Sequence, residues 1–209
     1  MIFHSYKSIF IHIPKTGGSS VENLLWPDLS TRTESDLWMG LVRPYFNKYQ
    51  TGGLQHLLAH QIKKEVGEDI FRQYYKFTLV RNPWDKVISQ YMFMINKRDD
   101  LRTYINMPKN ASLAEYIELI QKKEHVQWAK QVDFILDENG ELLVDDVFKL
   151  ENINDDASIM SSRIGLNFSE IPHDNKGSRK PYQDYYTEET KEMVYDIYKD
   201  DILYLNYNF

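Results

Sequence analysis

The chain has 209 residues, of which 42% are hydrophobic and 27% charged. This length can enclose a well-buried core, and the composition is that of an ordinary globular protein rather than a disordered one. The net charge of −6 disfavours nucleic acid as a partner, although a local basic site for a polyanion is compatible with it. The absence of cysteine excludes disulfides, thiolate catalysis and Cys-ligated zinc.

No long apolar segment interrupts the sequence. The N-terminus lacks a basic region followed by an apolar core, and no run approaches the ~18 apolar residues of a membrane span. We therefore expect a soluble, cytoplasmic protein with no membrane span. We see no internal repeat or linker, so we expect a single domain over residues 1–209.

The first motif is a short apolar run followed by a glycine loop. Ile9–Ile13 is too short for a free-standing helix and is rich in β-branched and aromatic residues, which predicts a buried strand. Two glycines allow close backbone approach to a ligand, and Ser19 or Ser20 is expected to cap the helix that follows. A lysine beside a helix N-terminus favours an anion site, most naturally for phosphate. An ordinary turn with a solvated lysine is the alternative. The loop consists of Lys15, Thr16, Gly17, Gly18, Ser19 and Ser20.

This loop differs from the ATP-binding P-loop. In G-x-x-x-x-G-K-[ST] the lysine follows the glycines, whereas Lys15 precedes Gly17 and Gly18. Position 12 is His12, where that motif would require glycine. The pattern weakens a kinase or ATPase interpretation.

Two histidines lie around the next predicted helix. Residues 27–53 are irregular and either line an acceptor cleft or pack onto the body. An amphipathic helix is then predicted up to Gly67, with His56 just before it and His60 on its second turn. Histidines four residues apart can share a metal, but no third ligand is evident, so no metal is predicted.

The second motif, Tyr75–Tyr91, is another predicted strand, loop and helix. Arg81 ends the buried strand, Asn82 suits the N-cap, and Pro83 suits the first helical position. The carboxyl end of a strand is where open α/β sheets bind ligands, although a surface salt bridge also explains Arg81. Ser89 lies away from the apolar stripe of the helix and is available to a ligand or to solvent.

The remaining elements are predicted from caps and turns. They are a helix capped by Ser112 and Glu115, a hairpin of Val132–Leu136 with Leu142–Val144, a strand over Asp146–Leu150, a helix over Asn154–Ile164 closed by Gly165, a basic loop from Pro172 to Pro181, and a last helix from about Thr187 to Tyr198.

The two motifs together resemble the PAPS-dependent sulfotransferases, and most closely the carbohydrate branch that includes heparan sulfate 2-O- and chondroitin sulfotransferases and small bacterial relatives. Residues 134–140, 147–152 and 182–207 are also similar to that family. The resemblance implies an α/β, P-loop-type three-layer fold with a central, mainly parallel sheet flanked by helices.

The resemblance also implies a donor, 3′-phosphoadenosine 5′-phosphosulfate, and roles for particular residues. Lys15 to Ser20 would cradle the 5′-phosphosulfate, and Arg81 and Ser89 would bind the 3′-phosphate. Lys176 and Arg179 would belong to a late basic loop over the nucleotide. His56 would be the general base, with His60 as the second candidate, since an imidazole can take a hydroxyl proton near neutrality.

The expected reaction is in-line sulfuryl transfer to a hydroxyl acceptor, with Lys15 neutralising charge on the leaving oxygen. The resemblance favours a glycan or a small sugar-containing acceptor and requires no metal. The alternatives are a P-loop kinase acting on a nucleotide or small molecule, which would need ATP and Mg²⁺, and a non-catalytic nucleotide-binding module. The sequence leaves the oligomeric state open.

Overall fold

The computed structural model describes residues 1–26, 56–171 and 179–209. By its internal contacts the chain divides into two compact units, each built from two separate stretches. Unit 1 comprises Met1–Val80 with Gln131–Lys176, and unit 2 comprises Arg81–Lys130 with Gly177–Phe209. The predicted acceptor segment, 27–53, and Lys176 lie outside the described residues. The single-domain expectation stays a prediction.

A four-stranded sheet is the centre of unit 1, in the order β1-β2-β3-β4. The strands are β1 (Ile2–Phe3), β2 (Ser8–Ile11), β3 (Tyr75–Val80) and β4 (Asp146–Lys149). The short β1 runs antiparallel to β2, whereas β2, β3 and β4 are parallel. Their carboxyl ends therefore lie at one edge, and the motif loop leaves β2 there. The sequence did not predict β1, because two residues carry no readable periodicity.

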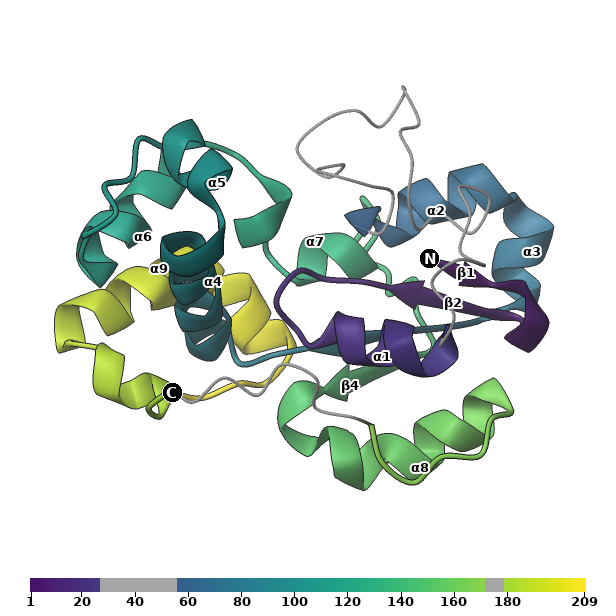
Figure 1. The fold of residues 1–209 in the computed structure, drawn as a ribbon. Coiled ribbons are helices and arrows are strands. Elements are labelled where there is room, and N and C mark those ends of the chain that lie inside the picture. Colours follow the sequence, from purple (N-terminus) through teal and green to yellow (C-terminus); the bar gives the residue numbers. More distant parts are fainter. Residues whose placement is uncertain (27–55, 172–178) are drawn as a thin grey trace. The chain divides into compact units, whose positions relative to one another are not determined.

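Helices cover both faces of this sheet (Figure 1). On one face Phe10, Phe77 and Phe148 pack in a common core with α1 (Gly18–Leu25) and α8 (Ile153–Ile164). The other face carries α2 (Ala59–Val66), α3 (Glu68–Gln73) and α7 (Val132–Ile135). The α/β fold with a mainly parallel sheet between helices is confirmed.

Unit 2 is helical. Its core joins apolar side chains of α4 (Pro83–Lys97), α5 (Asp99–Tyr104), α6 (Leu113–Gln121) and α9 (Glu188–Tyr204), with the short 3₁₀ helices η6 (Val126–Trp128) and η8 (Tyr182–Tyr185) beside them. The predicted capping box at Ser112 and Glu115 is present. No helix in the described ranges is long and apolar enough to cross a bilayer.

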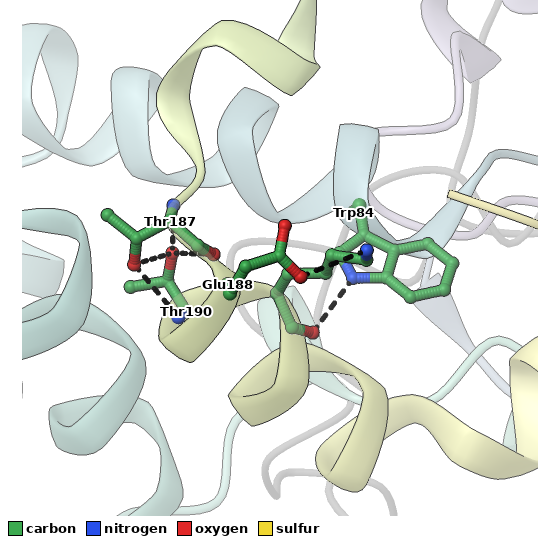
Figure 2. Close-up of polar contacts among 5 residues, drawn as sticks. Trp84, Thr187, Glu188 and Thr190 are labelled. Atoms are coloured by element: carbon green, nitrogen blue, oxygen red, sulfur yellow. Dashed lines mark hydrogen bonds and ion pairs between the residues drawn. The ribbon is translucent and has the colours of Figure 1, made fainter.

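The first turns of α4 and α9 are joined through Trp84 (Figure 2). Its indole N–H donates to the backbone carbonyl of Lys191 over 3.0 Å. At the start of α9 Thr187 and Thr190 bond each other reciprocally, which satisfies N–H groups that the helix leaves unpaired. As predicted, Asn82 caps α4: its side chain accepts from the Trp84 N–H over 3.1 Å.

The predicted hairpin near residue 140 is only partly formed: its turn is present, but most of its first arm is not a strand. Val132–Ile135 is a short helix, and the turn that follows has only one antiparallel bridge, Leu136 to Leu142. A run of four apolar-rich residues does not distinguish a buried strand from a buried helix, and here Phe134 and Ile135 are buried as helix. The last helix continues past its predicted end to Tyr204, through a kink at Tyr198.

Candidate functional site

The loop after β2 has an unusual backbone. Lys15 has φ = 67° and Gly17 has φ = 88°, so two of three consecutive residues are left-handed. Thr16 between them is fully buried and its hydroxyl donates to the carbonyl of Ile13 over 2.9 Å. A left-handed lysine is strained by roughly 1 kcal/mol, and such strain concentrates at functional sites. Alternating backbone of this kind turns N–H groups toward one concave point, which suits an anion.

The helix α1 adds its N-terminus to this concavity. It begins at Gly18 with Gly17 as N-cap, and glycine offers no side chain to bond the first N–H groups. The prediction that Ser19 or Ser20 caps the helix is wrong, because both lie inside its first turn. The Ser20 N–H donates to the Gly17 carbonyl over 3.1 Å. The uncapped helix start offers N–H groups and a positive dipole end to an anion.

Both glycines have close neighbours at the position of a Cβ, and Gly17 also has a left-handed backbone. A Cβ at Gly18 would lie 2.2 Å from Cδ2 of His12, and one at Gly17 would lie 2.7 Å from Cδ1 of Leu150. The loop backbone therefore lies directly against the buried ring of His12 and the partly buried side chain of Leu150. Larger residues at these positions would push the loop away from them.

His56 lies in unit 1 with the loop. It is 7% exposed, and its Nδ1 is 3.0 Å from the carbonyl oxygen of His12. A carbonyl can only accept, so Nδ1 carries the hydrogen and Nε2 carries the lone pair. Burial, followed by the neighbouring His12, lowers the pKa of His56 from 6.5 to about 3. The ring is thus neutral at neutral pH, with Nε2 in the form that accepts a proton.

His60 has a different environment. It is exposed and lies in the first turn of α2, which begins at Ala59, rather than in the second turn as predicted. His56 precedes the helix, so the two histidines do not form a pair one turn apart on a helix face.

In unit 2 two arginines converge on one carboxylate. The Arg81 Nε donates to Oδ2 of Asp85 over 2.8 Å, and its Nη2 lies 2.7 Å from the same oxygen. The Nη2 of Arg179 donates to the other carboxylate oxygen, Oδ1. Ser89 follows one turn later on α4 and is half-buried. The sequence predicted both arginines but missed Asp85, whose signal was an acidic residue in the first turn of the helix that follows Arg81.

Two guanidinium groups face the one carboxylate of Asp85 in this cluster. The Nη1 atom of Arg179 is buried and has no hydrogen-bond partner among the residues that the structure describes. A buried charged donor without an acceptor is costly, and an anion would satisfy it. The arrangement therefore suits a phosphate or sulfate group.

The predicted residues thus form two groups. Lys15 to Ser20 and His56 lie in unit 1, connected through His12, and Arg81, Ser89 and Arg179 lie in unit 2, organised by Asp85. Each group has the chemistry of an anion site, and the first also has a base.

Comparison with known proteins gives one family. An uncharacterized protein from Archaeoglobus fulgidus is 29% identical over 108 residues, which cover 52% of this chain and 82% of the relative. No solved structure matches the chain. The model of the sulfotransferase family matches residues 1–208. The chain therefore belongs to the sulfotransferase family.

Proposed function

We propose that this sulfotransferase takes its sulfuryl group from 3′-phosphoadenosine 5′-phosphosulfate and transfers it to a hydroxyl group, with a carbohydrate as the favoured acceptor class. The observation that carries the proposal is the loop from Lys15 to Ser20. Its left-handed residues and the uncapped start of α1 form a backbone anion cradle, and Lys15 supplies a cation beside it. The family membership supplies the sulfuryl chemistry.

Each group of residues, taken by itself, has the chemistry for one end of this donor. The 5′-phosphosulfate suits the loop because its glycines bring backbone N–H groups close to a ligand. The 3′-phosphate suits Arg81 and Arg179, whose planar guanidinium groups match phosphate geometry, and the buried Nη1 of Arg179 needs an acceptor. Ser89 would add a hydroxyl donor from the same helix as Asp85. Lys176 belongs to this proposal on the resemblance alone.

The chemical step is an in-line displacement at sulfur. The acceptor hydroxyl oxygen forms a bond to sulfur while its proton passes to Nε2 of His56. The bond from sulfur to the bridging oxygen breaks, and adenosine 3′,5′-bisphosphate leaves with the electron pair. Lys15 neutralises the charge on that oxygen, and the loop N–H groups hold the sulfuryl oxygens.

The environment of His56 is consistent with a base in this step. Its Nδ1–H is fixed by the carbonyl of His12, so Nε2 is the basic atom. The pKa of about 3 applies to the ligand-free protein. A bound anion raises this pKa, because a nearby negative charge favours the protonated ring. Exposed His60 is the second candidate.

The first experiment tests the donor by calorimetric titration with adenosine 3′,5′-bisphosphate and with AMP. We expect the bisphosphate to bind at least 10-fold more tightly, and Arg81→Lys to remove most of that preference. Arg98→Lys is the matched control, because Arg98 is also paired with a carboxylate, that of Asp100, in unit 2. Equal affinity for both nucleotides would refute the donor, and Mg²⁺-dependent ATP binding would favour a kinase.

The second experiment tests the reaction with donor carrying radiolabelled sulfate and a panel of glycans and small alcohols. Lys15→Ala should lower the rate about 10²–10³-fold, the loss typical of one oxyanion donor. Lys7→Ala is its control, because Lys7 is another left-handed lysine, exposed and outside the loop. His56→Asn should lower the rate about 10²–10⁴-fold.

Two histidine controls accompany His56→Asn. His125→Asn alters another histidine with a lowered pKa, in unit 2, and should leave the rate unchanged. If His60→Asn greatly lowers the transfer rate while His56→Asn retains activity, the base is His60 rather than His56. Donor binding without transfer to any acceptor would favour a non-catalytic nucleotide-binding module.

A further inference from the structure

His12 is a buried polar residue that the proposed chemistry does not use. It follows β2 directly, is 8% exposed, and contacts three parts of unit 1. Its ring contacts Glu22 in α1, Gly18 at the start of that helix, and the ring of His56. It therefore touches both the proposed donor loop and the proposed base.

The contact with Glu22 fixes the ring. Nδ1 of His12 lies 2.5 Å from Oε1 of Glu22, and both side chains are about nine-tenths buried. The two atoms lie within ion-pair distance, although the angle at this contact is not that of a good hydrogen bond. Burying this pair costs more than burying an apolar pair of the same size, so apolar packing alone does not account for it.

The opposite edge of the ring supports the loop. A Cβ on Gly18 would lie 2.3 Å from Nε2 and 2.2 Å from Cδ2 of His12, so the ring fills the space next to the Gly18 backbone. Any rotation of the ring would press on the first residue of α1 or open a gap beneath it. The position of the loop therefore depends on the orientation of His12.

The same residue orients His56 in two ways. Its backbone carbonyl accepts from Nδ1 of His56 at 3.0 Å, which selects the form with a basic Nε2. Its ring meets the His56 ring nearly edge-on, with centroids 4.7 Å apart and planes at 61°. Tautomer and ring direction of His56 are both fixed by one neighbour.

We propose that His12, held by Glu22, is a positioning residue that sets the base His56 and the donor loop relative to each other. The inference rests on the proposed function, because it needs His56 to act on an acceptor of the donor's sulfuryl group. His12 does not react. It acts through ring contacts that hold Nε2 of His56 and the donor loop in fixed positions relative to each other.

The test compares His12→Leu with His12→Asn in the full chain. Leucine fills the space but cannot donate to Glu22, whereas the asparagine side-chain N–H can replace Nδ1–H. We expect kcat to fall at least 10-fold in His12→Leu and less than 3-fold in His12→Asn, at similar Tm. Glu22→Gln, which keeps the shape, should lower kcat 3- to 10-fold and remains informative if His12→Leu does not fold. In each variant Kd for adenosine 3′,5′-bisphosphate should change less than 3-fold.

A second readout does not depend on turnover. Adenosine 3′,5′-bisphosphate should shift the ring NMR signals of His56 in the wild type, and this shift should fall at least 3-fold in His12→Leu although the ligand still binds. His125→Leu and His125→Asn form the control pair: His125 stacks on Trp128 in unit 2 and should affect Tm without affecting kcat.

The outcomes distinguish a failure of the proposed function from a failure of the positioning role of His12. A wild type that neither binds the bisphosphate nor transfers sulfate rejects the proposed function, and this inference with it. An active wild type whose kcat survives His12→Leu rejects the positioning role alone. Equal losses of kcat in His12→Leu and His12→Asn, in proportion to Tm, would leave His12 a packing residue and also reject the role.

Discussion

Gly18→Ala is the sharpest perturbation of the site, because its cost follows directly from distances. The added Cβ would lie 2.2, 2.3 and 2.9 Å from three ring atoms of His12, whereas ordinary contacts begin near 3.4 Å. The ring must move by more than 1 Å, and it is not a flexible chain end: Glu22 holds it on one side and His56 on another. Overpacking costs about 1–3 kcal/mol, and separating a buried polar pair adds a similar amount. We expect Gly18→Ala to destabilise the protein by about 3 kcal/mol.

Gly17→Ala is the matched comparison. Its strain comes from a left-handed backbone, worth about 1–2 kcal/mol, and its new methyl meets only the end of the Leu150 side chain at 2.7 Å. Urea unfolding followed by circular dichroism should show a lower midpoint for Gly18→Ala, by about 1 M at an m-value of about 2–3 kcal/mol/M, and a smaller shift for Gly17→Ala.

A double-mutant cycle identifies the cause. In a His12→Ala background the obstructing ring is absent, so the added cost of Gly18→Ala should fall below about 1 kcal/mol. A cost of Gly18→Ala that is unchanged without the His12 ring, or one below 0.5 kcal/mol in the native background, would refute the steric reasoning.

Three further predictions concern single side chains. The folded pKa of His56, about 3, lies below its unfolded value of about 6.5, so the unfolded chain binds more protons in this range and stability falls as the pH falls. About 1.6 kcal/mol should be lost between pH 6.5 and pH 5, and His56→Asn should remove that part of the slope in urea titrations at each pH. Asn82→Ala should cost about 1–2 kcal/mol in urea unfolding, because it removes the α4 cap and a 2.7 Å bond to the Asn208 carbonyl; no loss would mean that water replaces both. Trp84→Phe should cost about 1 kcal/mol, because the Lys191 carbonyl loses its indole donor; an unchanged urea midpoint would contradict this.

The sequence predicted correctly those helices and strands whose formation depends on interactions between residues close together in the chain. The strand–loop–helix units around Lys15 and Arg81 could be read because apolar runs, glycines and caps act within a few residues. Asn82 as cap with Pro83 at the first helical position, and Gly165 closing α8, are confirmed for the same reason. The fold class followed from the resemblance of the two motifs to the sulfotransferases, and the mainly parallel sheet between helices bears it out.

The failures also have local causes. Ser19 and Ser20 resemble caps in sequence, but α1 starts earlier, at Gly18, because the left-handed Gly17 already turns the chain. Residues 132–136 have the composition of a strand, and packing in unit 1 decides in favour of a helix.

The sequence by itself determined which residues have anion-binding chemistry: a lysine before two glycines, and an arginine at the end of a strand. Tertiary structure decided the partners. Asp85 pairs with both Arg81 and Arg179, although Arg179 lies 94 positions after Asp85 in the chain. His12 contacts both the loop and His56, although His56 lies 44 positions after His12. Such contacts produce no periodic pattern in the sequence, because they depend on how distant segments pack rather than on the neighbours of each residue in the chain.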